Sequence, residues 1–288
     1  MSSVKLLSPA KVNLFLRILR KRPDGYHELQ SVAQPVSLFD EISLSVREGD
    51  GISLNRSGRD MPSGRDNLAV SACSLYLEAA AVSRRVSIGI NKNIPVGGGL
   101  GGGSANAAAV LVGLNRILRK FTDAELVPMA ASLGADAPFF IRSTASFIEG
   151  AGEKVTPLAD FPLFHYVILF PKKSLSTREV YGKWEPPRRP PEEINPEKLV
   201  EQFRRGGFPV ENDLERAVCG IFPDILSFKE IFRSLGMRSV LVSGSGSCVF
   251  SVFREPREAE EIYEYLRASR DFDVFLARGI SGWHFVAD

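Results

Sequence analysis

A run of glycines is the strongest chemical signal in this sequence. Six of the seven residues from 97 to 103 are glycine, and only Leu100 interrupts them. Glycine loses more conformational freedom on folding than any other residue, so such a run indicates backbone that passes close to something a side chain would block. Two interpretations compete: a flexible linker, or a loop that wraps around a ligand.

The flanking segments favour the ligand-binding loop. Residues 86–90 (VSIGI) alternate as a half-buried strand does, and residues 104–120 place apolar side chains on one helical face. Ser104 is a suitable N-cap for that helix. A linker would more often contain serine and proline and would not lead directly into an alanine-rich helix. The order strand, glycine loop, helix presents free N–H groups at a helix start, which predicts an anion site for phosphate.

The common nucleotide-binding loops do not fit this run. Three of its glycines match G-x-G-x-x-G, but a segment so rich in glycine matches that pattern almost by accident. A Rossmann unit needs an acidic residue at the end of a second strand about 20 residues later, whereas Thr122 and Glu125 predict a capping box there. A Walker loop needs lysine and then serine or threonine after its last glycine, and Gly103 is followed by Ser104 and Ala105.

Composition and charge narrow the class of protein. The chain has 288 residues, enough for one large or two ordinary domains, and 44% hydrophobic with 24% charged residues is typical of a globular protein. A net charge of +2 does not favour nucleic-acid binding. The 3 cysteines are widely spaced, as in neither a disulfide framework nor a zinc site. No apolar run reaches the ~20 residues of a membrane span, and Pro9, Lys11 and Asn13 interrupt the N-terminal apolar stretch. We expect a cytoplasmic protein without a membrane, nucleic-acid or obligate protein partner.

The element pattern predicts an α+β protein. One or two strands are expected before a turn at Asp24–Gly25, two more around residues 49–51, and a helix over residues 65–81. The proline-rich segment 185–198 reads as an exposed connector. After it, the order helix, strand, strand, helix, strand resembles half of a ferredoxin-like unit. We place a domain boundary between residues 150 and 162.

Three separated motifs together resemble the GHMP kinases. They are SPAKVNLFLRILRKRPDGYHEL (residues 8–29), PVGGGLGGGSANAA (residues 95–108) and LVSGSGSCVF (residues 241–250). The resemblance implies a two-domain GHMP kinase fold of the α+β class. Its ribosomal protein S5-like N-terminal domain would span residues 1–155 and bind ATP, and its ferredoxin-like C-terminal domain would span residues 156–288 and close the substrate cleft.

Within that superfamily, RPDGYHEL and GADAPFF are similar to kinases whose acceptor is a cytidine diphosphate-linked methylerythritol. This implies ATP-dependent transfer of the γ-phosphoryl group to the 2-hydroxyl of that small molecule, in the non-mevalonate route to isoprenoid precursors. The resemblance makes Lys11 and Asp136 the catalytic pair. Asp136 would accept the hydroxyl proton, and Lys11 would orient it and offset charge. Without the family, Lys11 is a solvated strand lysine and Asp136 a helix cap.

The resemblance also implies which residues bind ATP. The loop residues are Pro95, Val96, Gly97, Gly98, Gly99, Leu100, Gly101, Gly102, Gly103, Ser104 and Ala105, and the others are Asn67, Leu68 and Lys92. Asn67 could equally cap a helix, and Lys92 could be a solvent-facing charge. Where the superfamily usually shows two serines, this loop has Ser104 alone, so Ser104 is its one hydroxyl for phosphate or Mg²⁺. Mg²⁺ is expected with ATP, but no acidic residue stands out as its ligand.

The resemblance assigns the acceptor to a second group of residues. Tyr26 would stack on the cytosine and His27 would hydrogen-bond to it, with Asn13, Tyr181 and Thr177 as further contacts. The alternative for Tyr26 and His27 is a packed aromatic beside a turn histidine. Three rival functions stay open: a GHMP kinase with another acceptor alcohol, a nucleotide-binding sensor that has lost catalysis, and a dehydrogenase. An acceptor without a nucleobase does not need Tyr26 and His27, and the missing ribose-binding acid disfavours the dehydrogenase.

Overall fold

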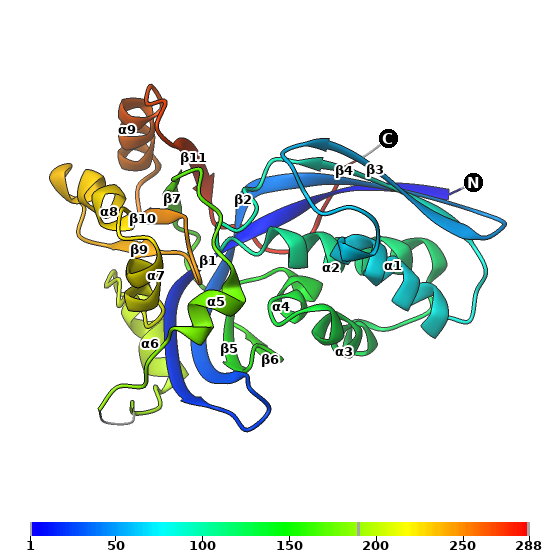
Figure 1. Ribbon diagram of the computed structural model, residues 1–288, viewed down its shortest axis with the longest axis horizontal. Coiled ribbons are helices and arrows are strands. Elements are labelled where there is room, and N and C mark those ends of the chain that lie inside the picture. Colours follow the sequence, from blue (N-terminus) through cyan, green and yellow to red (C-terminus); the bar gives the residue numbers. More distant parts are fainter. Residues whose placement is uncertain (1, 189–190, 287–288) are drawn as a thin grey trace.

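Two β-sheets form the framework of the molecule, with helices packed around both (Figure 1). The computed structural model describes residues 2–188 and 191–286. Residues 189 and 190, inside the predicted proline-rich connector, lie outside the described part. Within the described part, no helix is both long and apolar enough to span a bilayer.

The first sheet is 8-stranded and follows the path β12-β1-β2-β4-β3, with β5 and β6 joined through β2 and β8 joined to β1. Its strands are β1 (Ser2–Lys21), β2 (His27–Arg47), β3 (Gly51–Gly58), β4 (Arg85–Lys92), β5 (Ser146–Gly150), β6 (Lys154–Pro157), β8 (Glu211–Asn212) and β12 (His284–Val286). The expected shorter strands are in fact one long antiparallel hairpin of β1 and β2. Three irregularities in its register, the first between Pro9 and Ala10, let so long a hairpin bend.

Four α-helices cover one face of this sheet (Figure 1). They are α1 (Leu68–Ala79), α2 (Gly102–Leu118), α3 (Asp123–Leu133) and α4 (Ala137–Arg142), and a short 3-10 helix, η1 (Gly64–Asp66), precedes α1. The capping box of Thr122 and Glu125 is confirmed. Ser104 as the N-cap of α2 is wrong: the cap is Gly101, whose φ of 70° lies in the left-handed region that favours glycine. The loop therefore turns into the helix without a side-chain cap.

The second sheet is 4-stranded and antiparallel in the order β11-β7-β10-β9. Its strands are β7 (His165–Phe170), β9 (Val240–Val242), β10 (Val249–Phe253) and β11 (Asp273–Arg278). Helices α5 (Thr177–Gly182), α6 (Pro196–Arg204), α7 (Glu215–Ile221), α8 (Ile225–Ser234) and α9 (Pro256–Leu266) complete this half. Helix α9 connects the third and fourth strands, and the first lies between the third and fourth in the sheet. This is the ferredoxin-like arrangement that the sequence predicted.

Two details of the second half differ from the expected pattern. The predicted connector ends at Asn195, which caps α6, and Pro196 occupies the first turn, where its missing N–H leaves no bond unmade. After β11, the last strand β12 returns to the first sheet and pairs with β1, so the first and last strands lie side by side. The domain boundary between residues 155 and 156 stays a prediction. Strand β12 crosses it, because it comes from the C-terminal part of the chain but belongs to the first sheet.

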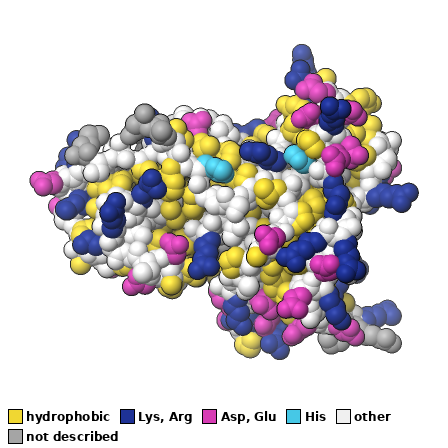
Figure 2. All heavy atoms as spheres, turned by 180° about the vertical axis from the view of Figure 1, so that it is seen from behind, with side chains coloured by type: hydrophobic (Ala, Val, Ile, Leu, Met, Phe, Trp, Pro, Cys, Tyr) yellow, Lys and Arg dark blue, Asp and Glu magenta, His cyan; other side chains and the backbone are white. Residues whose placement is uncertain are grey.

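Charges of both signs are mixed on one face of the molecule. On the face opposite to that of Figure 1, lysine and arginine side chains are interspersed with aspartate and glutamate (Figure 2). A surface of this kind lacks the continuous basic field that favours nucleic acid.

Candidate active site

A cavity of about 890 Å³ lies where the two halves of the molecule meet. It is bordered by the tip of the β1–β2 hairpin, the glycine loop, the start of α4, helix α5 and the turn after β9. Every residue that the sequence singled out for catalysis or binding lines it, with the exception of Ala105. Ala105 is fully buried within α2 and faces the core instead.

The carbonyl groups of the glycine loop are held by the second half of the chain. The carbonyl of Gly97 accepts from the amide of Leu175 at 3.0 Å, and that of Gly98 accepts from the amide of Cys248 at 3.0 Å. The Ser243 hydroxyl donates to the carbonyl of Gly99 at 3.1 Å. The turn between β9 and β10 therefore serves as a scaffold for the loop.

Leu100, the one interruption in the run, anchors the loop to the core between the two sheets. Its side chain is 1% exposed and packs in a cluster with side chains from β1, β7 and β10. Burial of such a side chain contributes about 1.5–3 kcal/mol. Its carbonyl accepts from the amide of Lys11 at 2.9 Å, so the loop and Lys11 are joined at this residue.

The amide groups of the loop are free. Among residues 2–188 and 191–286, no protein acceptor is found for the N–H groups from Gly97 to Ser104. The last three of them belong to the first turn of α2, where N–H groups have no partner within the helix. With its carbonyls bound and its amides unpaired, the loop is suited to hold a phosphate chain at the positive end of the α2 dipole.

Gly99 is the loop position least able to accept a side chain. Its φ is 75°, and a Cβ atom there would overlap the carbonyl oxygen of Ser243. We expect Gly99→Ala to lower the free energy of unfolding by about 1–3 kcal/mol and to weaken ATP binding, since the clash is with backbone. Urea unfolding and ATP titration measure the two effects.

Gly103→Ala is the matched control for stability. Its Cβ would meet only Leu68 Cδ1, at 3.8 Å, and its φ is not in the left-handed region. Alanine within a helix is expected to raise stability by about 0.5–1 kcal/mol. Equal unfolding midpoints for Gly99→Ala and Gly103→Ala would contradict the explanation.

Lys11 and Asp136 meet in the cavity although they are far apart in the sequence. Lys11 Nζ lies 3.5 Å from Asp136 Oδ2, with side-chain exposures of 5% and 46% respectively. Lys11 Nζ also donates to Asn13 Oδ1 at 2.5 Å, and Asn13 Nδ2 donates to the Ser31 hydroxyl at 2.9 Å. Lys11 is therefore not a solvated strand lysine. Asp136 occupies the N-cap position of α4, as the alternative had it, but its side chain makes no capping hydrogen bond.

A buried ion pair holds the start of the glycine loop. Lys92 Nζ donates to Asp40 Oδ2, and both side chains are almost fully buried. Asp40 Oδ1 accepts from the amides of Asn93 and Ile94, each at 2.8 Å. Burial lowers the pKa of Lys92, and the Asp40 carboxylate opposes that shift. Lys92 thus lines the cavity as a paired charge and not as a solvent-facing one.

Asn67 and Leu68 also line the cavity. Asn67 accepts from the amide of Ala69 at 3.0 Å as the N-cap of α1, and its Nδ2 donates to the carbonyl of Pro62 at 2.9 Å. Asn67 is therefore a helix cap, as the alternative had it, and it lines the cavity as well.

Aromatic rings gather around His27, which lines the cavity with Tyr26 and Tyr181. The ring of His27 lies 5.2 Å from that of Tyr181 and 5.2 Å from that of Trp184, whereas Tyr26 is 60% exposed. Burial, and then the charge of Lys21, lowers the pKa of His27. Burial, and then the charge of Asp136, raises the pKa of Tyr181. A neutral imidazole beside an exposed aromatic ring suits a planar, uncharged heterocycle.

Several residues of the site were not predicted. Asp40 and Trp184 are two, and Asn212 is a third: its Nδ2 donates to the carbonyls of Val242 and Gly244, each at 2.8 Å, and so holds the turn that supports the loop. The Ser245 hydroxyl lies 3.0 Å from that of Thr177. The only signal for Asp40 was a charged residue inside an apolar strand segment.

Two sequence profiles match the chain in its two halves. The GHMP kinases N terminal domain matches residues 67–144, and the GHMP kinases C terminal domain matches residues 198–270. A glycine loop with free amides, a lysine–aspartate pair and this pair of domains define a small-molecule kinase of the GHMP class.

Individual relatives narrow this class. A 4-diphosphocytidyl-2-C-methyl-D-erythritol kinase of Desulfotalea psychrophila is 41% identical over 95% of this chain and 94% of its own. One of Citrifermentans bemidjiense is 37% identical over 97% of this chain and 100% of its own. A crystal structure of 4-(cytidine 5'-diphospho)-2C-methyl-D-erythritol kinase has a TM-score of 0.81 at 38% identity and covers 96% of this chain and 100% of its own. The chain belongs to the 4-diphosphocytidyl-2-C-methyl-D-erythritol kinase family.

Proposed function

We propose that this protein transfers the γ-phosphoryl group of ATP to the 2-hydroxyl of 4-diphosphocytidyl-2-C-methyl-D-erythritol, in the non-mevalonate route to isoprenoid precursors. The observation that carries the proposal is one continuous cavity with three parts. The free loop amides, the rings of His27 and Tyr181, and the Lys11–Asp136 pair all line the same space. The cytoplasmic location of the protein stays a prediction.

Phosphoryl transfer depends mainly on positioning and on neutralising charge. The amides from Gly97 to Ser104 bind the phosphate oxygens of ATP. The acceptor hydroxyl lies beside Asp136, which takes its proton as the acceptor oxygen bonds to the γ-phosphorus and the bond to ADP breaks. Lys11 orients Asp136 and stabilises the negative charge of the transferring group. The bonds to Leu100 and Asn13 keep Lys11 in place.

The few protein oxygen atoms beside the loop are consistent with a Mg²⁺ ion that binds mainly to the phosphates of ATP. Among the described residues no group of three or more His, Cys, Asp or Glu side chains is placed to bind a metal, and Mg²⁺ commonly uses phosphates, waters and one or two protein oxygens. The Ser104 hydroxyl would lie 3.6 Å from a Cβ atom at Gly134, beside the segment that carries Asp136. Ser104 would hold the ion on the protein side. When bound, Mg²⁺ neutralises charge on the phosphates.

A panel of acceptors tests the proposed function. The protein is incubated with labelled ATP and, separately, with the cytidine diphosphate-linked methylerythritol, the same erythritol without the cytidine moiety, mevalonate and homoserine. We expect label only in the first product, since an acceptor without a nucleobase makes no use of Tyr26 and His27. Equal labelling of mevalonate or homoserine would overturn the choice of acceptor, and no labelling at all would favour the sensor.

Acceptor binding is expected to weaken in acid because of His27. Its pKa lies below the ordinary 6.5, so the imidazole is neutral at neutral pH. Protonation puts a positive charge into a largely buried site and removes a hydrogen-bond acceptor. The KM for the acceptor should be constant above about pH 7 and should rise as pH falls through the lowered pKa, by up to about tenfold per pH unit. Initial rates at saturating ATP measure it.

Two variants make this pH prediction specific. His27→Gln should show a raised KM that no longer changes with pH. His284 does not line the cavity, so His284→Gln should keep the profile of the unaltered protein. The free energy of unfolding should also decrease in acid. The His27 imidazole binds its proton more tightly in the unfolded chain than in the folded one, so its contribution to stability is lost as pH falls. If the KM for the acceptor rises in acid as much in His27→Gln as in the unaltered protein, another group causes the pH dependence.

A further inference from the structure

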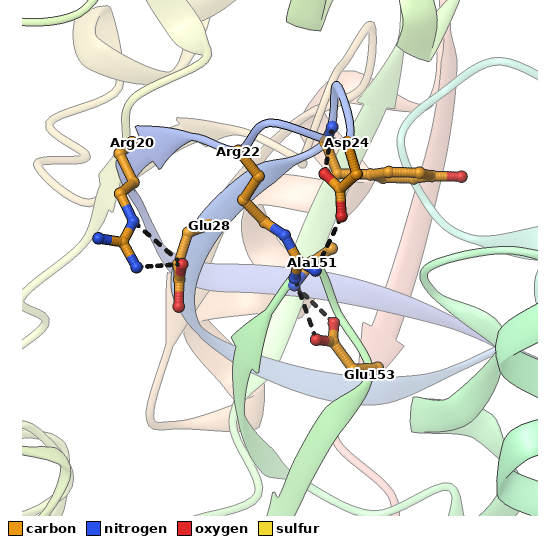
Figure 3. Close-up of polar contacts among 7 residues, drawn as sticks. Arg20, Arg22, Asp24, Glu28, Ala151 and Glu153 are labelled. Carbon is orange, nitrogen blue, oxygen red and sulfur yellow. Dashed lines mark hydrogen bonds and ion pairs between the residues drawn. The ribbon is translucent and has the colours of Figure 1, made fainter.

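Arg22 lies at the tip of the β1–β2 hairpin and joins two separate segments (Figure 3). Its Nη2 lies 2.8 Å from Asp24 Oδ2, within the hairpin, and its Nη1 donates to Glu153 Oε1 at 3.2 Å, across to the turn between β5 and β6. Asp24 Oδ1 in turn accepts from the amide of Tyr26 at 3.0 Å. One guanidinium therefore connects the backbone of Tyr26 to the β5–β6 turn.

That turn is braced against the segment that carries Asp136. Glu153 Oε2 accepts from the amide of Ala151 at 2.6 Å, which ties the turn to itself. Gly152 packs so closely on the carbonyl of Ala135 that a Cβ atom would lie 2.5 Å from that oxygen. Ala135 immediately precedes Asp136, and Ala151, Gly152 and Ala135 all line the cavity. A continuous set of contacts thus runs from the hairpin to the catalytic acid.

We propose that Arg22 is a positioning residue that sets the Tyr26–His27 hairpin relative to Asp136, so that binding of the cytidine moiety places the acceptor hydroxyl at the carboxylate. The proposal rests on the function proposed above and adds a residue to it. Arg22 and Glu153 do not themselves line the cavity, so they act through Tyr26 and the turn. Neither loop amides nor Asn67 take part, so ATP binding is independent of this contact.

Because these charged side chains are exposed, we expect their ion pairs to orient the hairpin rather than to stabilise the fold. The side chains of Arg22, Asp24 and Glu153 are 31%, 46% and 43% exposed. Ion pairs so open to water contribute little to folding. A displacement of about 1 Å in a reacting group, however, can cost about 10²-fold in rate. Loss of Arg22 should therefore change kinetics with the acceptor much more than it changes unfolding.

The same hairpin supplies a matched control. Arg20 donates to Glu28 at 2.9 Å on the same pair of strands, and in Figure 3 this pair is separate from the Arg22 group. Neither Arg20 nor Glu28 lines the cavity. Arg20→Gln removes an equal charge and an equal kind of ion pair, without touching the β5–β6 turn.

The test compares Arg22→Gln, Arg20→Gln, Glu153→Gln and the Arg22→Gln/Glu153→Gln double variant. For Arg22→Gln we expect kcat/KM for the cytidine acceptor to fall about tenfold, with the KM for ATP and the melting temperature unchanged. The double variant should be no worse than Arg22→Gln, because both changes break one contact. Arg20→Gln should match the unaltered protein. Equal values for Arg22→Gln and Arg20→Gln, or multiplied losses in the double variant, would overturn the proposal.

Titration with cytidine monophosphate separates this inference from the proposed function. Turnover by the unaltered protein tests the function, whereas the ratio between the two arginine variants tests the contact. If the unaltered protein does not phosphorylate the acceptor, the proposed function fails, and the affinities of the variants for cytidine monophosphate still decide about Arg22. Weaker binding in Arg22→Gln than in Arg20→Gln supports the inference, and equal binding contradicts it.

Discussion

Asp136→Asn is expected to lower kcat by about 10²–10⁴-fold while ATP binding is retained. Asparagine has nearly the same shape but cannot take the proton of the acceptor hydroxyl. Asp136 makes no capping hydrogen bond and its side chain is 46% exposed, so the change should not disturb α4. Single-turnover phosphorylation at saturating acceptor measures the rate, and calorimetric titration measures ATP binding.

Asp123→Asn is the control for a general loss of negative charge. Asp123 is an acidic residue in the first turn of α3 and does not line the cavity. This variant should turn over at the rate of the unaltered protein. If Asp136→Asn keeps that rate as well, Asp136 is not the proton acceptor, and the proposed mechanism loses its base.

Asp40→Ala is expected to lower the free energy of unfolding by about 3–5 kcal/mol. The variant leaves the ammonium group of Lys92, 3% exposed, without its counter-charge. The amides of Asn93 and Ile94 also lose their acceptor. A deeply buried charge without a partner is far less favourable than one in water. Urea unfolding followed by circular dichroism gives the free energy. ATP titration shows whether the affinity falls when the residues that precede the glycine loop lose their hydrogen bonds.

Glu41→Ala serves as the neighbouring control. Glu41 follows Asp40 in β2 but is exposed, so its loss should change stability by no more than about 0.5 kcal/mol. Adding Lys92→Met to Asp40→Ala should restore part of the lost stability, since it removes the unpaired charge. Equal unfolding midpoints for Asp40→Ala and Glu41→Ala would show that the ion pair does not hold this region together.

Local features of the fold were predictable because they depend on neighbouring residues. The capping box of Thr122 and Glu125 follows from side chains that bond to backbone three residues away. The strand before the glycine run and the helix after it follow from apolar periodicity. The error at Ser104 has the same origin: a glycine at positive φ can start a helix where a serine also could, and the residues alone do not distinguish the two.

Pairings between distant residues needed the folded chain. The ion pair of Asp40 and Lys92 joins residues 52 positions apart, and the C-terminal strand β12 pairs with the beginning of β1. Neither has a local pattern, because a β-sheet joins strands by hydrogen bonds that any backbone can make. Trp184 beside His27 is of the same kind, since α5 is placed there by the second sheet.

The residues alone predict a phosphate-binding loop between a strand and a helix, and motif resemblance adds the kinase class and its candidate residues. The three-dimensional arrangement adds what makes these a site: loop carbonyls held by the turn after β9, free amides, and Lys11 within 3.5 Å of Asp136. The physical reason is that backbone propensity acts over a few residues, whereas a catalytic pair depends on burial and contact across the whole chain.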